Sequence, residues 1–292
     1  MIKIQKSLEL LKHIFNQEIT KEFISICESI AKKNPNYINN GLGVNFSENG
    51  IESIKLYYGF HHQLTANEVG KLHIFGNPNT FYNIERLLTK SEYEWHPYYP
   101  TGVSFALKID KNMNASIGHF MMPKIMSNDL FFSLPKIVGY YKNNNTLPIL
   151  NRKGIFTLIN QNGEEHYKDY FYVRDINLKQ KIGDDFGVNT AIVPSIEWVI
   201  GKGFYSGSSS NDEKIVLQSN YEEVYNEIVK KETNNLIKTF NSQMLQNFNA
   251  YCVCPGFYKN KNIKSYYYFN GKISNPFIIN TISNIQLKLN SI

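Results

Sequence analysis

Three segments that lie far apart in the chain pair one lysine with tyrosines at alternate positions. These Lys/Tyr rows are Lys55 and Tyr57; Lys168, Tyr170 and Tyr172; and Lys264, Tyr266 and Tyr268. Alternate residues of a β-strand share one face, so each row places an ammonium group beside phenol rings. Ammonium and hydroxyl groups donate hydrogen bonds to anions, whereas aromatic faces attract cations. The rows therefore predict a site that holds an anion beside aromatic walls.

The rows also have a simpler interpretation, which stays open at this point. Lysines on a β-sheet often face water and protect its edges from pairing with other chains. A fourth segment fits the pattern only in part, because Lys202 is followed two residues later by Phe204 rather than by tyrosine. The chemistry depends on whether the rows line the inside of a closed sheet.

Composition favours a β-rich globular protein. The chain has 292 residues, of which 42% are hydrophobic and 14% aromatic, with 20 Tyr and 19 Phe. Aromatic residues favour strands, and this length suits one large domain, which we place over residues 1–292. The net charge of +6 permits an anionic ligand. Three cysteines make no disulfide framework, and the N-terminal segment does not resemble a signal peptide, so we expect a cytoplasmic protein.

Hairpin signals recur along the chain and alternate with helical patterns. Asn-Gly and other polar turns between apolar, aromatic runs predict five hairpins, at Gly41–Phe60, Gly102–Pro123, Gly154–Arg174, Asn189–Ser206 and Tyr251–Phe269. Apolar residues at helical spacing predict helices at 5–16, 20–32 and 220–249, with weaker patterns at 80–89 and 128–141. Thr20 is the expected N-cap of the second helix. The polar run 207–214 is expected to be an exposed loop.

Ten antiparallel strands form a sheet that is large enough to curl and close, which removes its exposed edges. We therefore expect an α+β fold in which a ten-stranded antiparallel β-barrel carries its helices on the outside. A barrel of this size is wide enough to enclose a ligand.

This order of elements, with lysine and tyrosine on inward faces, resembles the ABBA-type aromatic prenyltransferases over roughly residues 40–270. The segment from Val103–Ala106 through His119–Pro123 is similar to the second hairpin of the soluble bacterial and fungal group, which prenylates small phenols. Val193–Trp198 resembles that group's Tyr-Pro-Thr-x-x-Trp segment. The resemblance implies a prenyltransferase (PT) barrel of five αββα repeats.

The resemblance also implies roles for individual residues, because family members bind a prenyl diphosphate inside the barrel through Lys, Arg and Tyr. The implied catalytic residues are Lys55, Lys168, Lys264, Tyr57 and Tyr170. The implied substrate-binding residues are Tyr172, Arg174, Lys202, Tyr266, Tyr268, His119 and Trp198.

Two departures from the family pattern bear on the metal requirement. One branch has an Asp on the first hairpin as a magnesium ligand, where this chain has Tyr57. That branch also has a Lys on the second hairpin, where this chain has Ser116–His119. Lys55 and Lys168 are expected to compensate, as in the metal-independent branch, so we expect no cofactor, although the sequence leaves Mg²⁺ open.

The expected reaction transfers a dimethylallyl or geranyl group from an isoprenoid diphosphate to an aromatic small molecule, by Friedel-Crafts-type alkylation. The acceptor could also be a peptide, and we expect neither nucleic acid nor membrane as a partner. Glu52, Glu197 and His119 are candidates for accepting the final proton. Two alternatives are a single-stranded nucleic-acid-binding β-protein, which also combines lysine with stacking aromatics, and a non-catalytic barrel that carries a hydrophobic anion.

Overall fold

The computed structural model describes residues 2–33, 38–60, 103–121, 150–160, 165–173, 197–205, 208–218, 235–247, 250–258, 263–269 and 275–290. The described helices are α1 (Ile2–Asn16), α2 (Glu18–Lys33), α9 (Asn235–Asn247) and α10 (Asn275–Asn290). The first six strands are β1 (Ile38–Ser47), β2 (Gly50–Phe60), β3 (Val103–Asp110), β4 (Ala115–Met121), β5 (Leu150–Asn160) and β6 (Glu165–Val173). The remaining strands are β7 (Glu197–Tyr205), β8 (Ser208–Gln218), β9 (Ala250–Tyr258) and β10 (Ile263–Phe269).

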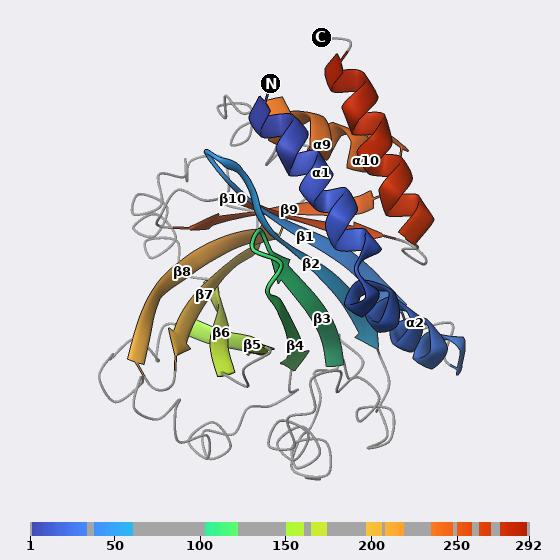
Figure 1. Cartoon of the computed structure of the whole chain (residues 1–292). Helices are drawn as coiled ribbons and strands as arrows, with labels where there is room; N and C mark the ends of the chain where they lie inside the picture. Colours follow the sequence, from blue (N-terminus) through green and yellow to red (C-terminus); the bar gives the residue numbers. More distant parts are fainter. Residues whose placement is uncertain are drawn as a thin grey trace.

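The described strands form one antiparallel sheet that closes on itself (Figure 1). Each strand from β2 to β10 pairs with the strand before it in the sequence. In addition, the first strand, β1, pairs with the last, β10, which closes the sheet. The β1–β10 pairing joins Asn40 to Phe269 and Phe46 to Ile263 at its two ends, and thereby connects the beginning of the sheet to its last strand. Closure satisfies backbone groups that an open edge would expose.

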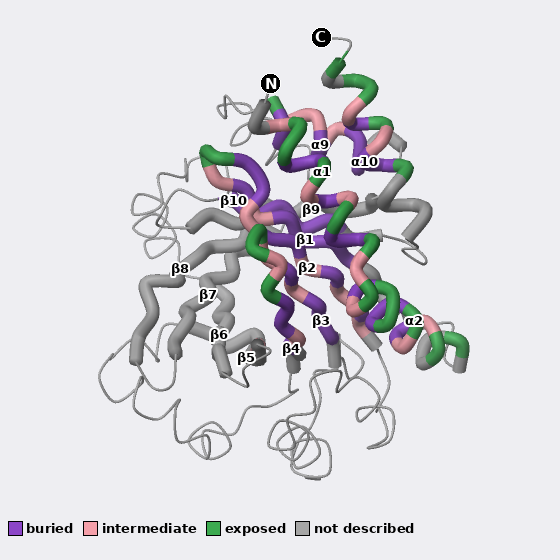
Figure 2. The backbone as a smooth tube through the Cα atoms, in the orientation of Figure 1, coloured by how far each residue is buried: buried purple, intermediate pink, exposed green. Residues whose placement is uncertain are grey.

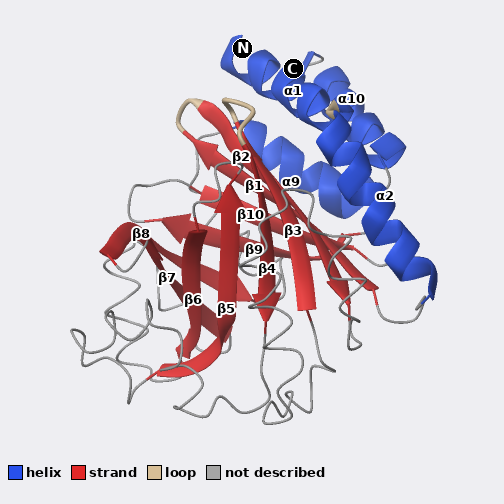
Figure 3. Ribbon diagram, turned by 60° about the horizontal axis from the view of Figure 1, so that its bottom comes forward, coloured by secondary structure: helices blue, strands red, loops and turns tan. Residues whose placement is uncertain are grey.

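The described helices pack on one side of this sheet (Figure 3). α1 packs against α2, α10 and β2, while α9 packs against α10 and β9. Edge-to-face contacts join the layers, with ring centroids 5.9 Å apart for Phe23 and Tyr58 and 6.1 Å apart for Phe46 and Phe240. Figure 2 shows the buried stretches of β1, β2 and β10 beneath these helices. The apolar face of the strands is thus the outer, helix-covered face.

The first two helices are separated by a single break at Gln17 rather than by a long linker. The Gln17 carbonyl accepts hydrogen bonds from the Thr20 amide at 3.1 Å and the Lys21 amide at 3.2 Å, at the start of α2. Thr20 already lies within α2, and its hydroxyl donates to the Ile14 carbonyl at 2.8 Å. The expected N-cap role of Thr20 is therefore wrong, because its hydroxyl instead donates to a carbonyl at the end of α1, which also accepts from the Gln17 amide.

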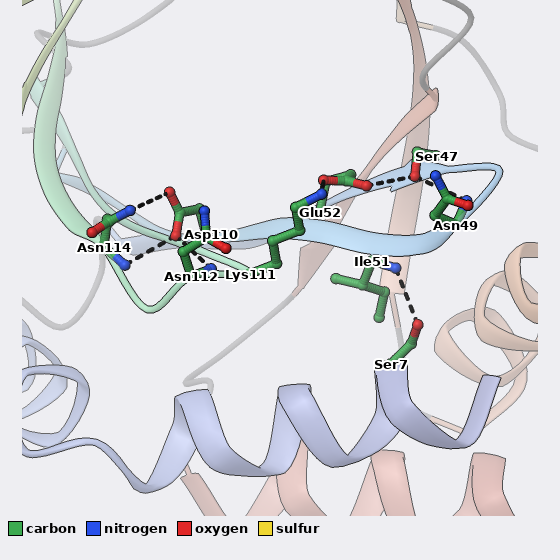
Figure 4. Close-up of polar contacts among 9 residues, drawn as sticks. All are labelled: Ser7, Ser47, Asn49, Ile51, Glu52, Asp110, Lys111, Asn112 and Asn114. Carbon is green, nitrogen blue, oxygen red and sulfur yellow. Dashed lines mark hydrogen bonds and ion pairs between the residues drawn. The ribbon is translucent and has the colours of Figure 1, made fainter. Parts of the chain in front are cut away.

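The β1–β2 hairpin contains a β-bulge at Glu52. The register places Phe46 opposite Ile51 and Asn45 opposite Ser53, so Glu52 is the extra residue. Its backbone carbonyl accepts from the Lys111 amide at 2.8 Å, and its carboxylate accepts from Ser47 and pairs with Lys111 (Figure 4). The bulge is therefore fixed by contacts with its own turn and with the neighbouring hairpin.

The β3–β4 turn is organised by one carboxylate. Asp110 accepts hydrogen bonds from the amides of Asn112 and Asn114 and from the Asn114 side chain (Figure 4). Met113 takes a positive φ of 67°, which closes the turn. The side chain of Asp110 thus replaces backbone partners that the turn cannot supply.

Most of the expected elements are present, and one hairpin was placed wrongly. The first, second, third and fifth hairpins are confirmed, as are the helices at 5–16 and 20–32. In the fourth hairpin, however, the second strand is β8, which covers nearly all of the polar run 207–214 that was expected to be a loop. Its register with β7, such as Gly201 opposite Lys214, holds this polar segment in the sheet in spite of its low strand propensity.

The helices that would separate the hairpins are described in part. Of the expected helix 220–249, the structure describes 235–247 as α9, and residues 219–234 lie outside the described residues. The patterns at 80–89 and 128–141 also lie outside them. α10 was not expected at all. No described helix combines the length and the apolar character that crossing a membrane would need.

Burial of a tyrosine hydroxyl and a cysteine thiol under the helices predicts that the folded protein loses stability at alkaline pH. Burial, together with the nearby Cys27 and Glu28, raises the pKa of Tyr58, and burial raises the pKa of the Cys27 thiol. The unfolded chain therefore loses these protons first, and stability should decline as the pH rises past the unfolded values of about 8.5 for Cys and about 10 for Tyr. In urea titrations under reducing conditions, Tyr58→Phe should reduce the decline above about pH 10 by about 1.4 kcal/mol per pH unit. An equal slope in the variant would contradict this origin.

Candidate functional site

The strand register defines a second face, opposite to the helix-covered one. Directly paired residues of antiparallel strands share a face, and Tyr57 pairs with Ala106, which pairs with Gly118, which pairs with Leu158. Leu158 pairs with His166 on β6, so the set continues there at alternate positions, which include Lys168 and Tyr170. We call it the inner face, because the sheet is closed and the described helices pack on the other side.

Lys264 is the centre of the described part of the inner face. It is 2% exposed, although it carries an ammonium group. Its Nζ lies 5.0 Å from the ring centroid of Tyr266 and 5.9 Å from that of Tyr57, and it donates to the Tyr57 hydroxyl at 3.4 Å. The Tyr57 and Tyr266 rings contact each other at 6.1 Å. Two of the predicted Lys/Tyr rows, 207 residues apart, thus meet in one cluster.

This cluster forms across a glycine. β1 lies between β2 and β10, and Gly43 is paired with Lys55 on one side and with Tyr266 on the other. Lys264 starts opposite Asn45 and crosses β1 over Gly43 to reach Tyr57. A Cβ on Gly43 would lie 2.8 Å from the Lys264 Cε and 3.0 Å from the Tyr57 Cε2. The absence of a side chain at residue 43 therefore leaves the space through which Lys264 passes.

The Tyr57 hydroxyl is kept neutral and has a proton to donate. Removal from water raises the pKa of Tyr57 far above its ordinary value. Since its oxygen accepts from Lys264, its own O–H can donate only to a different acceptor. The pair can thus offer an anion two donors, one of them charged.

Lys108 is a site candidate that the sequence interpretation missed. It pairs directly with Lys55 on β2 and with Ser116 on β4. Like charges that are directly opposite each other on neighbouring strands destabilise a sheet, which favours a bound anion between them. The positions that correspond to the family's lysine in the sequence comparison, 116–119, lie on the second strand of the hairpin. Lys108 supplies a cation from the first strand of that hairpin, and the alternation of Ala106 and Lys108 with apolar neighbours was the signal.

The third Lys/Tyr row lies across the barrel from this cluster. β6 is separated from β2 by β3, β4 and β5, and from β10 by β7, β8 and β9. Lys168 pairs with Phe156 and Gly203, and Tyr170 pairs with Gly154 and Gly201. Tracing the register in the other direction gives the same face, since Lys264 pairs with Gly256, Gly256 with Val216, Val216 with Val199, and Val199 with Tyr172. The backbone therefore puts all three rows in one set of positions.

The other predicted site residues that the structure describes divide between the inner set and the positions that alternate with it. Tyr268 pairs with Gly41 and Cys252, and it therefore belongs to the inner set together with Tyr266. His119 pairs with Phe105, Trp198 with Val173, and Lys202 with Asp169 and Glu213, so these three positions alternate with the inner set. Arg174 lies outside the described residues. The register therefore gives the roles of His119, Trp198 and Lys202 no support, and they stay predictions.

Glu52 has a structural role at the barrel end. Although partial burial acts to raise the pKa of Glu52, hydrogen bonds from Lys111 and Ser47 hold it below its ordinary value. Such a carboxylate is a weak base, and its partners are at the hairpin turns rather than beside Lys264. Within the described segments, no three His, Cys, Asp or Glu residues gather where they could ligate a metal.

Comparison with known proteins gives a result at the level of structure. No protein-family model matches the chain. No curated protein matches it by sequence. The chain is similar to the crystal structure of 5-dimethylallyl tryptophan synthase from Streptomyces coelicolor in complex with DMASPP and Trp, with 7% sequence identity and a TM-score of 0.58, over 91% of this chain and 93% of that one.

A second similar structure is AnaPT from Neosartorya fischeri, with 9% identity and a TM-score of 0.43, over 81% of this chain and 80% of that one. At this level of identity the first match establishes similarity of fold, and the second adds no argument. The chain therefore shares its fold with this dimethylallyl tryptophan synthase, as the resemblance in its sequence predicted.

Proposed function

We propose that this protein transfers a prenyl group from an isoprenoid diphosphate to an aromatic small molecule. The observation that carries the proposal is the Lys264–Tyr57–Tyr266 cluster, a buried ammonium between two phenol rings on the inner face of a sheet with this fold. The protein of similar fold that was crystallised with DMASPP and Trp supports the same two substrate classes here, a dimethylallyl-type donor and an aromatic acceptor.

The donor would bind through its diphosphate. The Lys264 ammonium lies in a position removed from water, where electrostatic interactions are stronger than in bulk solvent, and the Tyr57 hydroxyl beside it is a second donor. Lys55 and Lys108 add two cations on the adjacent strands β2 and β3. We place the diphosphate between these groups, with Lys168 and Tyr170 contributing from the opposite wall.

The reaction would begin when the bond between the allylic carbon and the diphosphate oxygen breaks. The electron pair leaves with the oxygen, so pyrophosphate gains charge that fixed ammonium and hydroxyl donors stabilise. The allylic cation would lie against the faces of Tyr57 and Tyr266, and tyrosine faces stabilise cations by about 0.5–2 kcal/mol each. The same rings would exclude water, which would otherwise consume the cation.

The aromatic acceptor would then form a carbon–carbon bond to the allylic cation and lose a proton. Pyrophosphate, a carboxylate or a water molecule would accept that proton, which restores the aromatic ring. The Glu52 carboxylate is occupied by Ser47 and Lys111, so it is a poor candidate. Positioning the acceptor face-on next to the donor supplies much of the remaining rate enhancement.

The proposal extends to the whole chain. We infer a PT barrel of five αββα repeats in a single domain over residues 1–292, in the cytoplasm. The closed order of the described strands and the similarity of fold over 91% of the chain support the barrel. The donor would carry a dimethylallyl or geranyl chain.

The direct test offers the purified protein dimethylallyl or geranyl diphosphate with a panel of phenols, indoles and aromatic peptides. Pyrophosphate release together with a prenylated product is the expected result. Binding of a geranyl thiodiphosphate without turnover of the ester would indicate a carrier instead. Steeply salt-dependent binding of single-stranded nucleic acid would favour the alternative function, although a lysine that is 2% exposed is poorly placed to contact a polynucleotide backbone.

Turnover is expected to continue in excess EDTA. Lys264, Lys55 and Lys108 would supply the positive charge that Mg²⁺ supplies in other diphosphate sites. The measurement is the initial rate of product formation in EDTA, compared with the rate after Mg²⁺ is added back. A rate that falls to background in EDTA and recovers with Mg²⁺ would contradict metal independence and leave the transferase proposal intact.

A further inference from the structure

We propose that Gly43 is a positioning residue, whose lack of a side chain allows Lys264 to reach the Tyr57 hydroxyl and hold an anion there. The inference rests on the proposed function only in taking the anion to be a diphosphate.

The geometry leaves Lys264 no alternative route to Tyr57 of equal length. Lys264 pairs with Asn45, whereas Tyr57 pairs with Gly41, which lies four residues earlier on β1, with Gly43 midway between them. The lysine stem must therefore cross the strand at residue 43. Its Cε would lie 2.8 Å from a Cβ at that position, and real Cβ atoms essentially never approach other atoms so closely.

A methyl group at residue 43 would displace Lys264 rather than Tyr57. The Tyr57 ring is rigid and is held against Tyr266, with ring centroids 6.1 Å apart, whereas the lysine stem has several rotatable bonds. The Nζ–Oη distance is already 3.4 Å. A shift of a few tenths of an ångström would carry it beyond about 3.5 Å, where a hydrogen bond is lost.

The Asn45 side chain could accept a hydrogen bond from a displaced Lys264. Among the described residues, Asn45 has a buried side-chain oxygen, Oδ1, with no hydrogen-bond partner. Asn45 is the residue directly opposite Lys264, so a retracted ammonium can reach it. Gly43→Ala is therefore expected to move the ammonium from Tyr57 towards Asn45 and away from the anion.

The test is a double-mutant cycle that measures binding of inorganic pyrophosphate by calorimetry, without any need for turnover. The four proteins are the wild type, Gly43→Ala, Lys264→Ala and the double variant. Gly43→Ala should weaken pyrophosphate binding about 10-fold or more, the usual loss for one charge-assisted hydrogen bond. In the Lys264→Ala background, where the obstructed stem is absent, the same change should have about no effect, since the effects of coupled residues are not additive.

Thermal unfolding of the unliganded proteins provides the folding control. A Tm of Gly43→Ala within about 4 °C of the wild type would show that the loss is not general destabilisation. A crystal structure of Gly43→Ala should show the Lys264 Nζ displaced from the Tyr57 hydroxyl.

Three results would overturn the inference: wild-type affinity in Gly43→Ala, an equal loss in both backgrounds, or no binding of pyrophosphate by the wild-type protein. Failure of the proposed function is a separate result. A protein that binds pyrophosphate with the expected dependence on Gly43 and Lys264, yet prenylates no acceptor, would keep the inference and exclude the transferase.

Discussion

Lys264→Met should lower kcat/KM for the prenyl donor by about 10²–10³-fold, the range for removing one donor that stabilises developing negative charge. Methionine keeps much of the stem that lies over Gly43 and removes the ammonium that contacts Tyr57 and Tyr266. Steady-state kinetics with a saturating acceptor measure the change. Most of the loss should be in kcat, because the charge on the departing pyrophosphate exceeds that of the bound donor.

The folded state should tolerate this substitution, which separates activity from stability. Replacing a buried charge by an apolar side chain of similar volume is often neutral or stabilising, so the Tm should stay constant or rise. Lys6→Met on the exposed side of α1 removes the same charge far from the inner face and should leave kcat/KM unchanged. Wild-type kinetics in Lys264→Met would mean that Lys264 does not act on the leaving group.

Lys108→Met should weaken donor binding by about 10–100-fold, the expected loss for one hydrogen bond to a charged group. Lys108 pairs with Lys55 on the inner face, and a diphosphate between them would relieve the repulsion of two directly opposed cations. The measurement is the rise in Tm that pyrophosphate causes, since a ligand that binds only the folded protein stabilises it in proportion to the logarithm of its affinity. The variant should show a smaller rise.

Lys111→Met is the matched control for Lys108→Met. Lys111 is three residues away, its side chain is 51% exposed, and it pairs with Glu52 at the turn. It carries the same charge outside the inner face, so its loss should leave the pyrophosphate-induced rise in Tm as in the wild type. Equal effects of the two substitutions would indicate a long-range electrostatic effect rather than a binding site at Lys108.

The sequence predicted the hairpins well where turn chemistry is local. Gly50, with a φ of 116°, and the Asp110 turn could be located because their residue types favour those conformations. The β8 strand could not be located, since Ser, Asn, Asp and Glu favour loops and the pairing with β7 that holds them in the sheet is a tertiary effect. α10 was missed for a related reason, because it is stabilised by packing against α1 and α9.

The site shows the same division between local and non-local information. The alternation of Lys264 with Tyr266, and of Lys55 with Tyr57, predicted which residues share a face. That Lys264 would meet Tyr57 across Gly43 could not be predicted, because it depends on the register between β1 and β10. The alternation of Lys108 with its apolar neighbours indicated which face of the strand it occupies, but its pairing with Lys55 depends on the register between β2 and β3.

The pairing of β1 with β10 has a consequence for how activity appears during folding. Tyr57 and Gly43 come from the first hairpin, whereas Lys264 comes from the last, so the cluster assembles at the seam where the two ends of the sheet join. A nascent chain that lacks the last hairpin has neither a complete cylinder nor this ammonium. In the proposed reaction, ionisation of a prenyl donor would therefore begin only after β10 has paired with β1. An incompletely synthesised chain would then not release a reactive carbocation into water.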